Sequence, residues 1–365
     1  MLLHEVIEYA ARQEPSAPAL ITEDRSWTYG ELWAAIVGTA TWLAERVPPG
    51  ERISVVADNS AEVVALLYAA PMVGVTAMLA NTRLVPSEID ALIDDVDPAL
   101  VVGERRLIDG LRRGDGAVAF DSDGYAALEA GAGPGPGPGP GAGAGVGVGV
   151  GVGVDGEAVA ARVRAVSSDH AAWIIHTSGT TGRPKGAVLT HRSLMAGVMA
   201  TALARPLGED DSYLFPFPLF HVAAYNVIHA HLKRRPVVLV PRFEAETVMR
   251  LIETHRVTTL SLAPTMISML LDHPERNRFD LTSLRHIFYG ASAIPLDVLR
   301  RGIAVFGCGF GQGYGMTELS GNAVFLDAAA HAQAIDGEEH LLASCGKPSP
   351  LVSIGLDSVG ADGTG

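Results

Sequence analysis

A chain of 365 residues is long enough to form two or three packed units with sizeable hydrophobic cores. Its 41 acidic and 27 basic residues give a net charge of −14, which argues against a nucleic-acid-binding surface. Cys308 and Cys345 have no C-x-x-C spacing and indicate a reduced compartment, while a disulfide between them stays open. Glu5 and Glu8 stand where an export signal would be apolar, so we expect a cytoplasmic protein.

Strand and helix candidates alternate along the chain. Thr28 and Glu31 have the spacing of a capping box, which predicts a helix over Leu32–Leu43. The strand candidates are Arg52–Ala57, Ala99–Val102, Ala172–His176, Pro236–Val240, Thr258–Leu262 and Leu284–Tyr289, and helical stretches include Glu246–His255, Thr265–Leu271 and Leu296–Phe306. This alternation predicts an α/β fold of mostly parallel sheets covered by helices, with ligands at the carboxyl ends of the strands.

The range Val63–Ala80 needs separate treatment because it runs eighteen residues without a charge, the crude length of a membrane span. Pro71, Gly74 and Thr76 interrupt it. A buried helix, a short turn and a strand ending at Asn81 explain the pattern better, so we expect no membrane span.

Glycine occupies every odd position from Gly131 to Gly153, alternating first with Ala and Pro and then with Val. Period two excludes collagen, and the side chains are too small to offset the entropy of ordering the segment. We therefore expect a flexible insertion over residues 131–156. It would divide one α/β domain into a first part, 1–130, and a remainder, 157–365.

The run His176–Gly186 reads H-T-S-G-T-T-G-R-P-K-G and follows the apolar stretch Ala171–Ile175. Glycines let backbone N–H groups approach an anion, hydroxyls donate to phosphate oxygens, and the lysine adds a mobile positive charge. The spacing is not that of a P-loop, because the fifth residue after Gly179 is Pro184. The composition predicts a phosphate-holding loop rather than a solvated turn.

A second string, G-Q-G-Y-G-M-T-E, spans Gly311–Glu318. Its tyrosine offers a flat face to a base, and the threonine and glutamate suit a phosphate oxygen and a hard cation. Alone the string would indicate a packed Gly-rich turn. Together, T-S-G-T-T-G-x-P-K-G and Y-G-M-T-E resemble the signatures of the adenylate-forming superfamily, which includes acyl- and aryl-CoA synthetases.

Three further stretches resemble the acyl- and aryl-CoA synthetase branch: T-Y-x-E-L at Thr28–Leu32, N-x-R-L at Asn81–Leu84, and the loop Tyr289–Pro295. The resemblance implies the large N-terminal domain of that fold, with stacked sheets. It also implies site residues. The ATP phosphates would be held by Thr177, Ser178, Gly179, Thr180, Thr181, Gly182 and Lys185. The adenine and the acyl-adenylate would contact Gly290, Ala291, Ser292, Gln312, Gly313, Tyr314, Gly315 and Thr317, with Tyr314 stacking on the base.

In the same resemblance Glu318 would place Mg²⁺, and His221 stands where a histidine or aromatic residue gates the acyl tunnel. Lys185, Thr317, Glu318 and His221 are the candidate catalytic residues. The implied reaction is attack of a fatty or aryl carboxylate on the α-phosphorus of ATP, followed by transfer to coenzyme A. An amino-acid substrate is disfavoured because no aspartate follows Phe220. The alternative is an inactive remnant that binds nucleotide or acyl groups.

After Asp357–Gly365 the family pattern would continue with a T-G-D aspartate, a hinge and a C-terminal lid that carries a catalytic lysine. None of these has a counterpart in this sequence. We therefore expect an N-terminal domain that ends early, lacks the lid, and is impaired in turnover unless a separate C-terminal piece supplies the lid.

Overall fold

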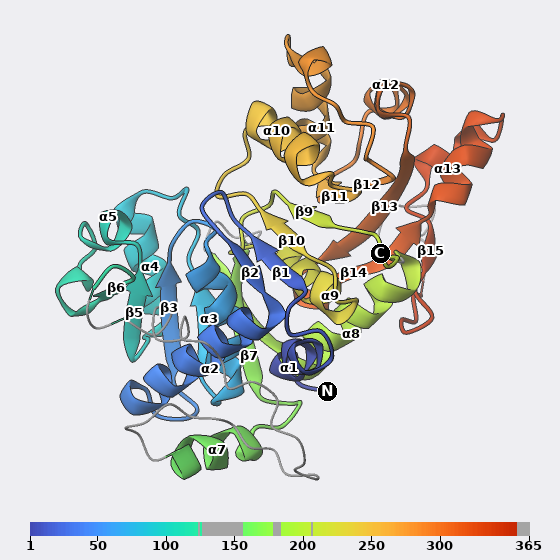
Figure 1. The fold of residues 1–365 in the computed structure, drawn as a ribbon. Helices are drawn as coiled ribbons and strands as arrows, with labels where there is room; N and C mark the ends of the chain where they lie inside the picture. Colours follow the sequence, from blue (N-terminus) through green and yellow to red (C-terminus); the bar gives the residue numbers. More distant parts are fainter. Residues whose placement is uncertain (123–124, 126–155, 178–183, 206, 356–365) are drawn as a thin grey trace, which may run out of the picture.

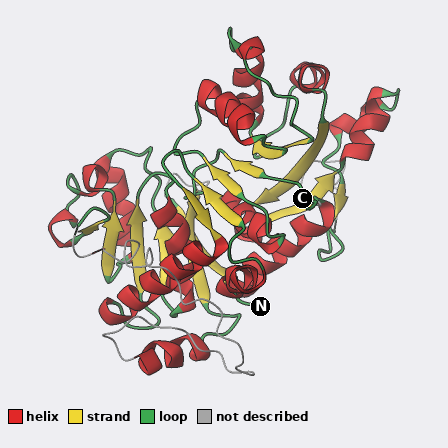
Figure 2. Cartoon of the chain, viewed as in Figure 1, coloured by secondary structure: helices red, strands yellow, loops and turns green. Residues whose placement is uncertain are grey.

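The computed structural model describes residues 1–122, 125, 156–177, 184–205 and 207–355. The predicted insertion, residues 131–156, lies outside these residues except for Gly156. In the described part of the chain the strands form two sheets with helices around and between them (Figures 1 and 2).

The larger sheet has nine strands within the described residues. In spatial order they are β15 (Lys347–Pro348), β14 (Gly321–Leu326), β13 (Gly309–Met316), β12 (His286–Gly290), β11 (Thr259–Leu262), β9 (Tyr213–Phe215), β10 (Val237–Leu239), β1 (Pro18–Ile21) and β2 (Ser26–Thr28). The strands from β13 to β1 run parallel to one another, and β15, β14 and β2 are antiparallel to their inner neighbours.

The smaller sheet has six strands in the same part of the chain. Their order is β6 (Val118–Ala119), β5 (Leu100–Gly103), β3 (Arg52–Val56), β4 (Thr76–Leu79), β7 (Ala171–Thr177) and β8 (Lys185–Thr190). Only β8 is antiparallel to its neighbour among these described strands. Strands from both sides of the predicted insertion share this sheet.

The described α-helices are α1 (Leu3–Gln13), α2 (Tyr29–Arg46), α3 (Ala61–Met72), α4 (Pro86–Val96), α5 (Arg105–Ile108), α7 (Gly156–Ala165), α8 (His191–Ala204), α9 (Tyr225–Leu232), α10 (Ala245–His255), α11 (Pro264–Leu271), α12 (Leu296–Phe306) and α13 (Ala328–Ile335). Short 3₁₀ turns lie at η1 (Gly114–Gly116), η3 (Val222–Ala224), η4 (Arg276–Arg278), η5 (Thr317–Leu319) and η6 (Glu339–Ala343).

Alternate side chains of β4 and of β9 enter different cores, so sheets and helices pack in layers (Figure 1). Tyr213 and Phe215 of β9 pack between the two sheets, with residues of α1, α2, α3, α8 and α9. Leu214 of the same strand faces the outer helices α10, α11 and α12. On the far side of the smaller sheet, Met78 and Ile174 pack with α4. Helices therefore cover both faces of each sheet, as expected for buried parallel strands.

Most of the predicted elements are confirmed. The six strand candidates correspond to β3, β5, β7, β10, β11 and β12, and α12 has its predicted bounds. The capping box of α2 forms, since Glu31 N donates to Thr28 Oγ1 (3.2 Å) and Thr28 N donates to Glu31 Oε2 (2.8 Å). The uncharged range Val63–Ala80 is divided between buried α3 and buried β4, as predicted.

Two smaller expectations can be compared with the structure. Among the helices that the structure describes, none has the length and apolarity to traverse a bilayer. Cys308 and Cys345 are free thiols, so the disulfide that the sequence left open is not formed.

Candidate active site

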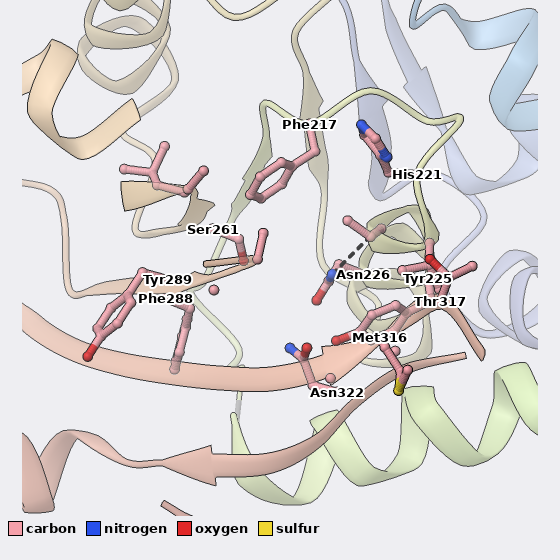
Figure 3. A pocket seen from close by; sticks show the side chains of 18 of the residues that line it. Phe217, His221, Tyr225, Asn226, Ser261, Phe288, Tyr289, Met316, Thr317 and Asn322 are labelled. Atoms are coloured by element: carbon pink, nitrogen blue, oxygen red, sulfur yellow. Dashed lines mark hydrogen bonds between the residues drawn. The ribbon is translucent and has the colours of Figure 1, made fainter. Parts of the chain in front are cut away.

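Seven of the predicted site residues line a cavity of about 530 Å³, which Figure 3 shows from close by. It opens where parallel strands end: Phe217 follows β9, Ala263 follows β11, and Gly290 ends β12. Arg83 after β4 and Thr177 at the end of β7 complete it from the smaller sheet. The cavity thus lies at the carboxyl ends of strands from both sheets, where open α/β sheets bind ligands.

Five of the predicted residues line the mouth of this cavity, and we call them the rim: Thr177, Gly290, Ala291, Thr317 and Glu318. Gly315 and His221 also line the cavity. Lys185, Ser292, Gln312, Gly313 and Tyr314 are described by the structure but are not among its lining residues. Ser178, Gly179, Thr180, Thr181 and Gly182 lie outside the described residues.

The described ends of the predicted phosphate loop belong to β7 and β8, which pair antiparallel with each other. Thr177 and Lys185 stand opposite each other in the ladder, and the Thr177 hydroxyl lies 3.5 Å from the Lys185 carbonyl oxygen. Lys185 is exposed. The two ends of the motif are therefore fixed by sheet hydrogen bonds, next to the rim.

The second motif is a strand and a 3₁₀ turn rather than the Gly-rich turn that its composition suggested. Gly311–Met316 belongs to β13, and Thr317 and Glu318 lie in η5, which follows it. Tyr314 is 56% exposed, and the Tyr289 hydroxyl donates to Gln312 Oε1 (3.3 Å). Glycine content alone does not decide between a turn and a closely packed strand, so the packed turn that the string alone would indicate is not what forms here.

Close packing between strands explains several of these glycines. A Cβ on Gly313 would lie 2.2 Å from Asn322 Nδ2, and one on Gly315 would lie 2.0 Å from the Gly321 carbonyl oxygen. A Cβ on Gly290 would lie 2.6 Å from the Gly313 oxygen. Glycine is therefore needed at these positions to bring β12, β13 and β14 together, whatever ligand the site takes.

The rim also contains strained backbone. Ala291 has φ of 69°, in the left-handed region that a non-glycine residue rarely adopts. Such strain is found at ligand-binding positions and persists only where the surrounding structure enforces it. Here β12 ends at Gly290, and the chain turns out along the cavity.

Helix α8 packs against the loop that carries the rim residues Thr317 and Glu318, a contact that the sequence did not predict. A Cβ on Gly197 of α8 would lie 2.5 Å from the Ser320 carbonyl oxygen, directly after η5. Ser320 is itself fully buried with φ of 59°. The absence of a side chain at Gly197 thus sets how closely the loop carrying Thr317 and Glu318 can approach the helix.

His221 lies on the cavity wall, as Figure 3 shows, next to the 3₁₀ turn Val222–Ala224. Desolvation, and then the Arg83 guanidinium, lower the pKa of His221 below its usual range. The ring is therefore neutral at neutral pH. It can donate or accept one hydrogen bond but adds no positive charge to the cavity.

Four further lining residues do not belong to any motif found in the sequence. We call them the inner wall: Arg205, Asn226, Ser261 and Phe288. Arg205 follows the carboxyl end of α8 and is only 4% exposed. Its Nη1 donates to Asn226 Oδ1 (3.1 Å) and its Nη2 to Ser261 Oγ (2.7 Å). Its guanidinium carbon lies 3.9 Å from the centre of the Phe288 ring, a cation–π contact.

The rim fits phosphate and Mg²⁺ by its chemistry. Thr317 and Glu318 present a hydroxyl and an exposed carboxylate beside the cavity. No group of three or more His, Cys, Asp or Glu suited to a metal occurs in the described residues. Mg²⁺ typically binds to one or two carboxylates together with substrate phosphates, so one rim carboxylate beside a phosphate-holding hairpin matches its needs.

Comparison with known proteins agrees with this geometry. Residues 7–358 match the AMP-binding enzyme family. A feruloyl-CoA synthase from an Amycolatopsis species is 30% identical over 357 residues, which cover 95% of this chain and 64% of the synthase. The chain spans about two thirds of the length of the curated relatives it matches.

Solved structures show the same fold. The o-succinylbenzoate CoA synthetase from Bacillus subtilis, in complex with ATP and magnesium ion, has a TM-score of 0.71 at 25% identity, covering 94% of this chain and 65% of that chain. The N-terminal domain of FACL13 from Mycobacterium tuberculosis has a TM-score of 0.72 at 23% identity, covering 91% of this chain and 80% of that domain. The motifs, the layered sheets and the match over residues 7–358 together show that this chain belongs to the AMP-binding family of adenylate-forming enzymes.

Proposed function

We propose that the protein activates a carboxylic acid with ATP, forming an acyl-adenylate and pyrophosphate, as the first step of ligation to coenzyme A. The observation that carries this proposal is the single cavity that joins the end of the phosphate hairpin, the β12 loop and the Thr317–Glu318 turn. Each comes from a different part of the chain. Their meeting at one opening supports a ligand with a phosphate end and a less polar end.

The chemistry asks for positioning and charge neutralisation rather than covalent help from the protein. We propose that Thr177 and Lys185 orient the outer phosphates and that Thr317 holds the α-phosphate. Glu318 would hold Mg²⁺, which neutralises charge that develops on the phosphate oxygens. Neutral His221 would hold the acid without attracting its carboxylate away from the α-phosphorus. The roles of Ser178 to Gly182, and of Tyr314 as the base-stacking residue, stay predictions.

The acid belongs to a class that the relatives suggest. Their names refer to ferulate, 2-succinylbenzoate and fatty acids as substrates. Phe217, Met266 and Phe288 give this cavity apolar walls, which supports an aryl or fatty acyl group here as well. Coenzyme A as the final acceptor and a cytoplasmic location are part of the same proposal.

Isothermal titration of Mg-ATP and of AMP tests the nucleotide site. Both should bind, and Lys185→Ala should weaken ATP binding more than AMP binding, because its charge is assigned to the outer phosphates. Lys233→Ala is a matched control, since Lys233 follows α9 and does not line the cavity. A folded sample that releases no heat with millimolar Mg-ATP would overturn the proposal.

Pyrophosphate release tests the reaction. Release should require a carboxylic acid, and a hydroxylamine trap should collect the activated acyl group as its hydroxamate. Equal release with and without acid would instead indicate simple ATP hydrolysis and contradict acid activation.

A further inference from the structure

Arg205 is a buried cation without a carboxylate partner in the part of the chain that the structure describes. Its side chain forms no ion pair there, and its Nε–H has no hydrogen-bond acceptor. Asn226 and Ser261, which accept from it, are neutral. The Phe288 ring and the carboxyl end of α8 supply only partial negative charge. A charge removed from water in this way is unfavourable unless a counter-charge joins it.

The residues that accept hydrogen bonds from Arg205 also leave a donor available beside it. Ser261 Oγ accepts from Arg205 Nη2 (2.7 Å) and from the Tyr213 hydroxyl (2.8 Å), so the hydrogen of its own hydroxyl remains available to donate. The amide of Asn226 is engaged with Arg205 on one side and donates to the Ala223 carbonyl oxygen (2.9 Å) on the other. The inner wall therefore combines a positive charge with available N–H and O–H donors, the complement of a carboxylate.

The inner wall lies well below the rim. Ser261 pairs with Phe288 in the register of β11 and β12, and Phe288 precedes the rim residue Gly290 by two positions. Two residues of a strand span roughly 7 Å. Figure 3 shows Ser261, Asn226 and Phe288 around the same space that Thr317 borders. A group that reaches Arg205 would thus sit at the far end of an acyl chain whose near end is at the rim.

We propose that the acid activated by this protein carries a second carboxylate, which the inner wall binds through Arg205 and Ser261. This inference rests on the proposed function and names its substrate class: a dicarboxylic acid with one carboxylate at the rim and the other at Arg205. An acid with a purely apolar tail would fill the cavity but leave the Arg205 charge without a counter-charge. Such an acid is therefore the weaker ligand.

Binding of stable acyl-adenylate mimics, in which a sulfamate replaces the phosphate, tests this assignment on the unaltered protein. A series of ω-carboxylate acyl chains is compared with ω-methyl chains of the same lengths. At the best length the ω-carboxylate should bind roughly 10- to 100-fold more tightly, the range for a buried charge-assisted contact. Arg205→Met, which keeps an unbranched side chain but removes the guanidinium and its charge, should remove that preference, and Ser261→Ala should reduce it. AMP affinity should stay unchanged in both variants.

Each outcome decides something. If AMP and every mimic fail to bind the folded protein, the proposed function itself is wrong. If both series bind and the ω-methyl chains bind equally well or better at every length, the function stands and the dicarboxylate assignment is wrong. If Arg205→Met does not fold, the comparison of ω-carboxylate and ω-methyl chains on the unaltered protein still tests the dicarboxylate assignment.

Discussion

The rim and the inner wall of the cavity are built in opposite ways. The rim consists of small residues and one carboxylate on strand ends and turns, and close backbone contacts at Gly290, Gly315 and Gly197 hold it in place. The inner wall consists of polar and aromatic side chains that follow α8 or belong to α9, β11 and β12, and the buried Arg205 guanidinium contacts the other three. The geometry of the rim depends on glycines that lack a side chain, whereas the properties of the inner wall depend on the side chains that are present.

Because of this difference, substitutions in the two regions should have different effects. Backbone groups and hydroxyls at the rim suit phosphates, which every adenylating reaction shares. A side-chain wall can change its charge and shape without moving a strand. We therefore expect rim substitutions to affect catalysis or folding, and inner-wall substitutions to affect which acid is chosen. The following predictions test that division in order of decreasing effect.

Glu318→Gln should lower acid-dependent pyrophosphate release roughly 100-fold, because it removes the carboxylate proposed to hold Mg²⁺, the cation that neutralises the reacting phosphates. Binding of AMP and the preference between acyl mimics should be unchanged, since the inner wall is intact. Glu246→Gln, on the exposed face of α10, is the control and should behave like the unaltered protein. A parallel loss of acid selectivity in Glu318→Gln would contradict the separation of rim and inner wall.

Acidification should destabilise the region around the inner wall. Desolvation, and then the charges of Arg205 and Lys233, lower the pKa of His229 from 6.5 to about 3. Because the folded-state pKa is depressed, the unfolded chain binds the proton more readily, and stability is lost as the pH falls from about 6.5 toward 3. His229→Leu should therefore reduce the loss of unfolding free energy between pH 7 and pH 4 by roughly 2–3 kcal/mol.

Chemical denaturation at several pH values measures this. Ile228→Leu, a buried substitution next to His229 that does not titrate, is the control and should keep the slope of the unaltered protein. An unchanged slope in His229→Leu would show that this histidine is not held neutral by its surroundings.

Gly197→Ala should destabilise the protein by roughly 1–3 kcal/mol, the usual cost of overpacking, because the new methyl group would press on the Ser320 carbonyl oxygen. In an ordinary helix the same substitution stabilises by about 1 kcal/mol, so even the sign is diagnostic. Gly110→Ala is the control, since a Cβ there meets nothing within 4 Å. Thermal unfolding measures the stability of Gly197→Ala, and titration with AMP measures its affinity for the nucleotide. If Gly197→Ala is as stable as the unaltered protein and binds AMP equally well, Gly197 does not support the rim.

Ala291→Gly should have the smallest effect, raising the free energy of unfolding by about 0.5–1 kcal/mol. Glycine removes the cost of φ at 69°, and its greater freedom in the unfolded chain offsets part of this gain. Ala293→Gly does not have a positive φ to relieve and should lower stability or leave it unchanged. If both variants respond alike, the rim does not store strain at Ala291.

The sequence could predict the rim because its residues lie in short contiguous strings. The central parallel strands were also predictable, since β3, β7 and β10 are short stretches rich in Val, Ile and other apolar residues. Strand β13 was not, because alternating glycines at Gly309–Met316 have low strand propensity and form a strand only through the close approach of β12 and β14. The inner wall was missed for another reason. Arg205, Ser261 and Phe288 lie far apart in sequence, and only the folded sheets and α8 bring them together.

The most direct test of the account is a crystal structure of the protein with an ω-carboxylate acyl-adenylate mimic. We expect the adenosine and sulfamate at the rim, beside Thr317 and Ala291, and the distal carboxylate within hydrogen-bonding distance of Arg205 and Ser261. A ligand bound outside the cavity, or one whose acyl chain points away from the inner wall, would contradict it.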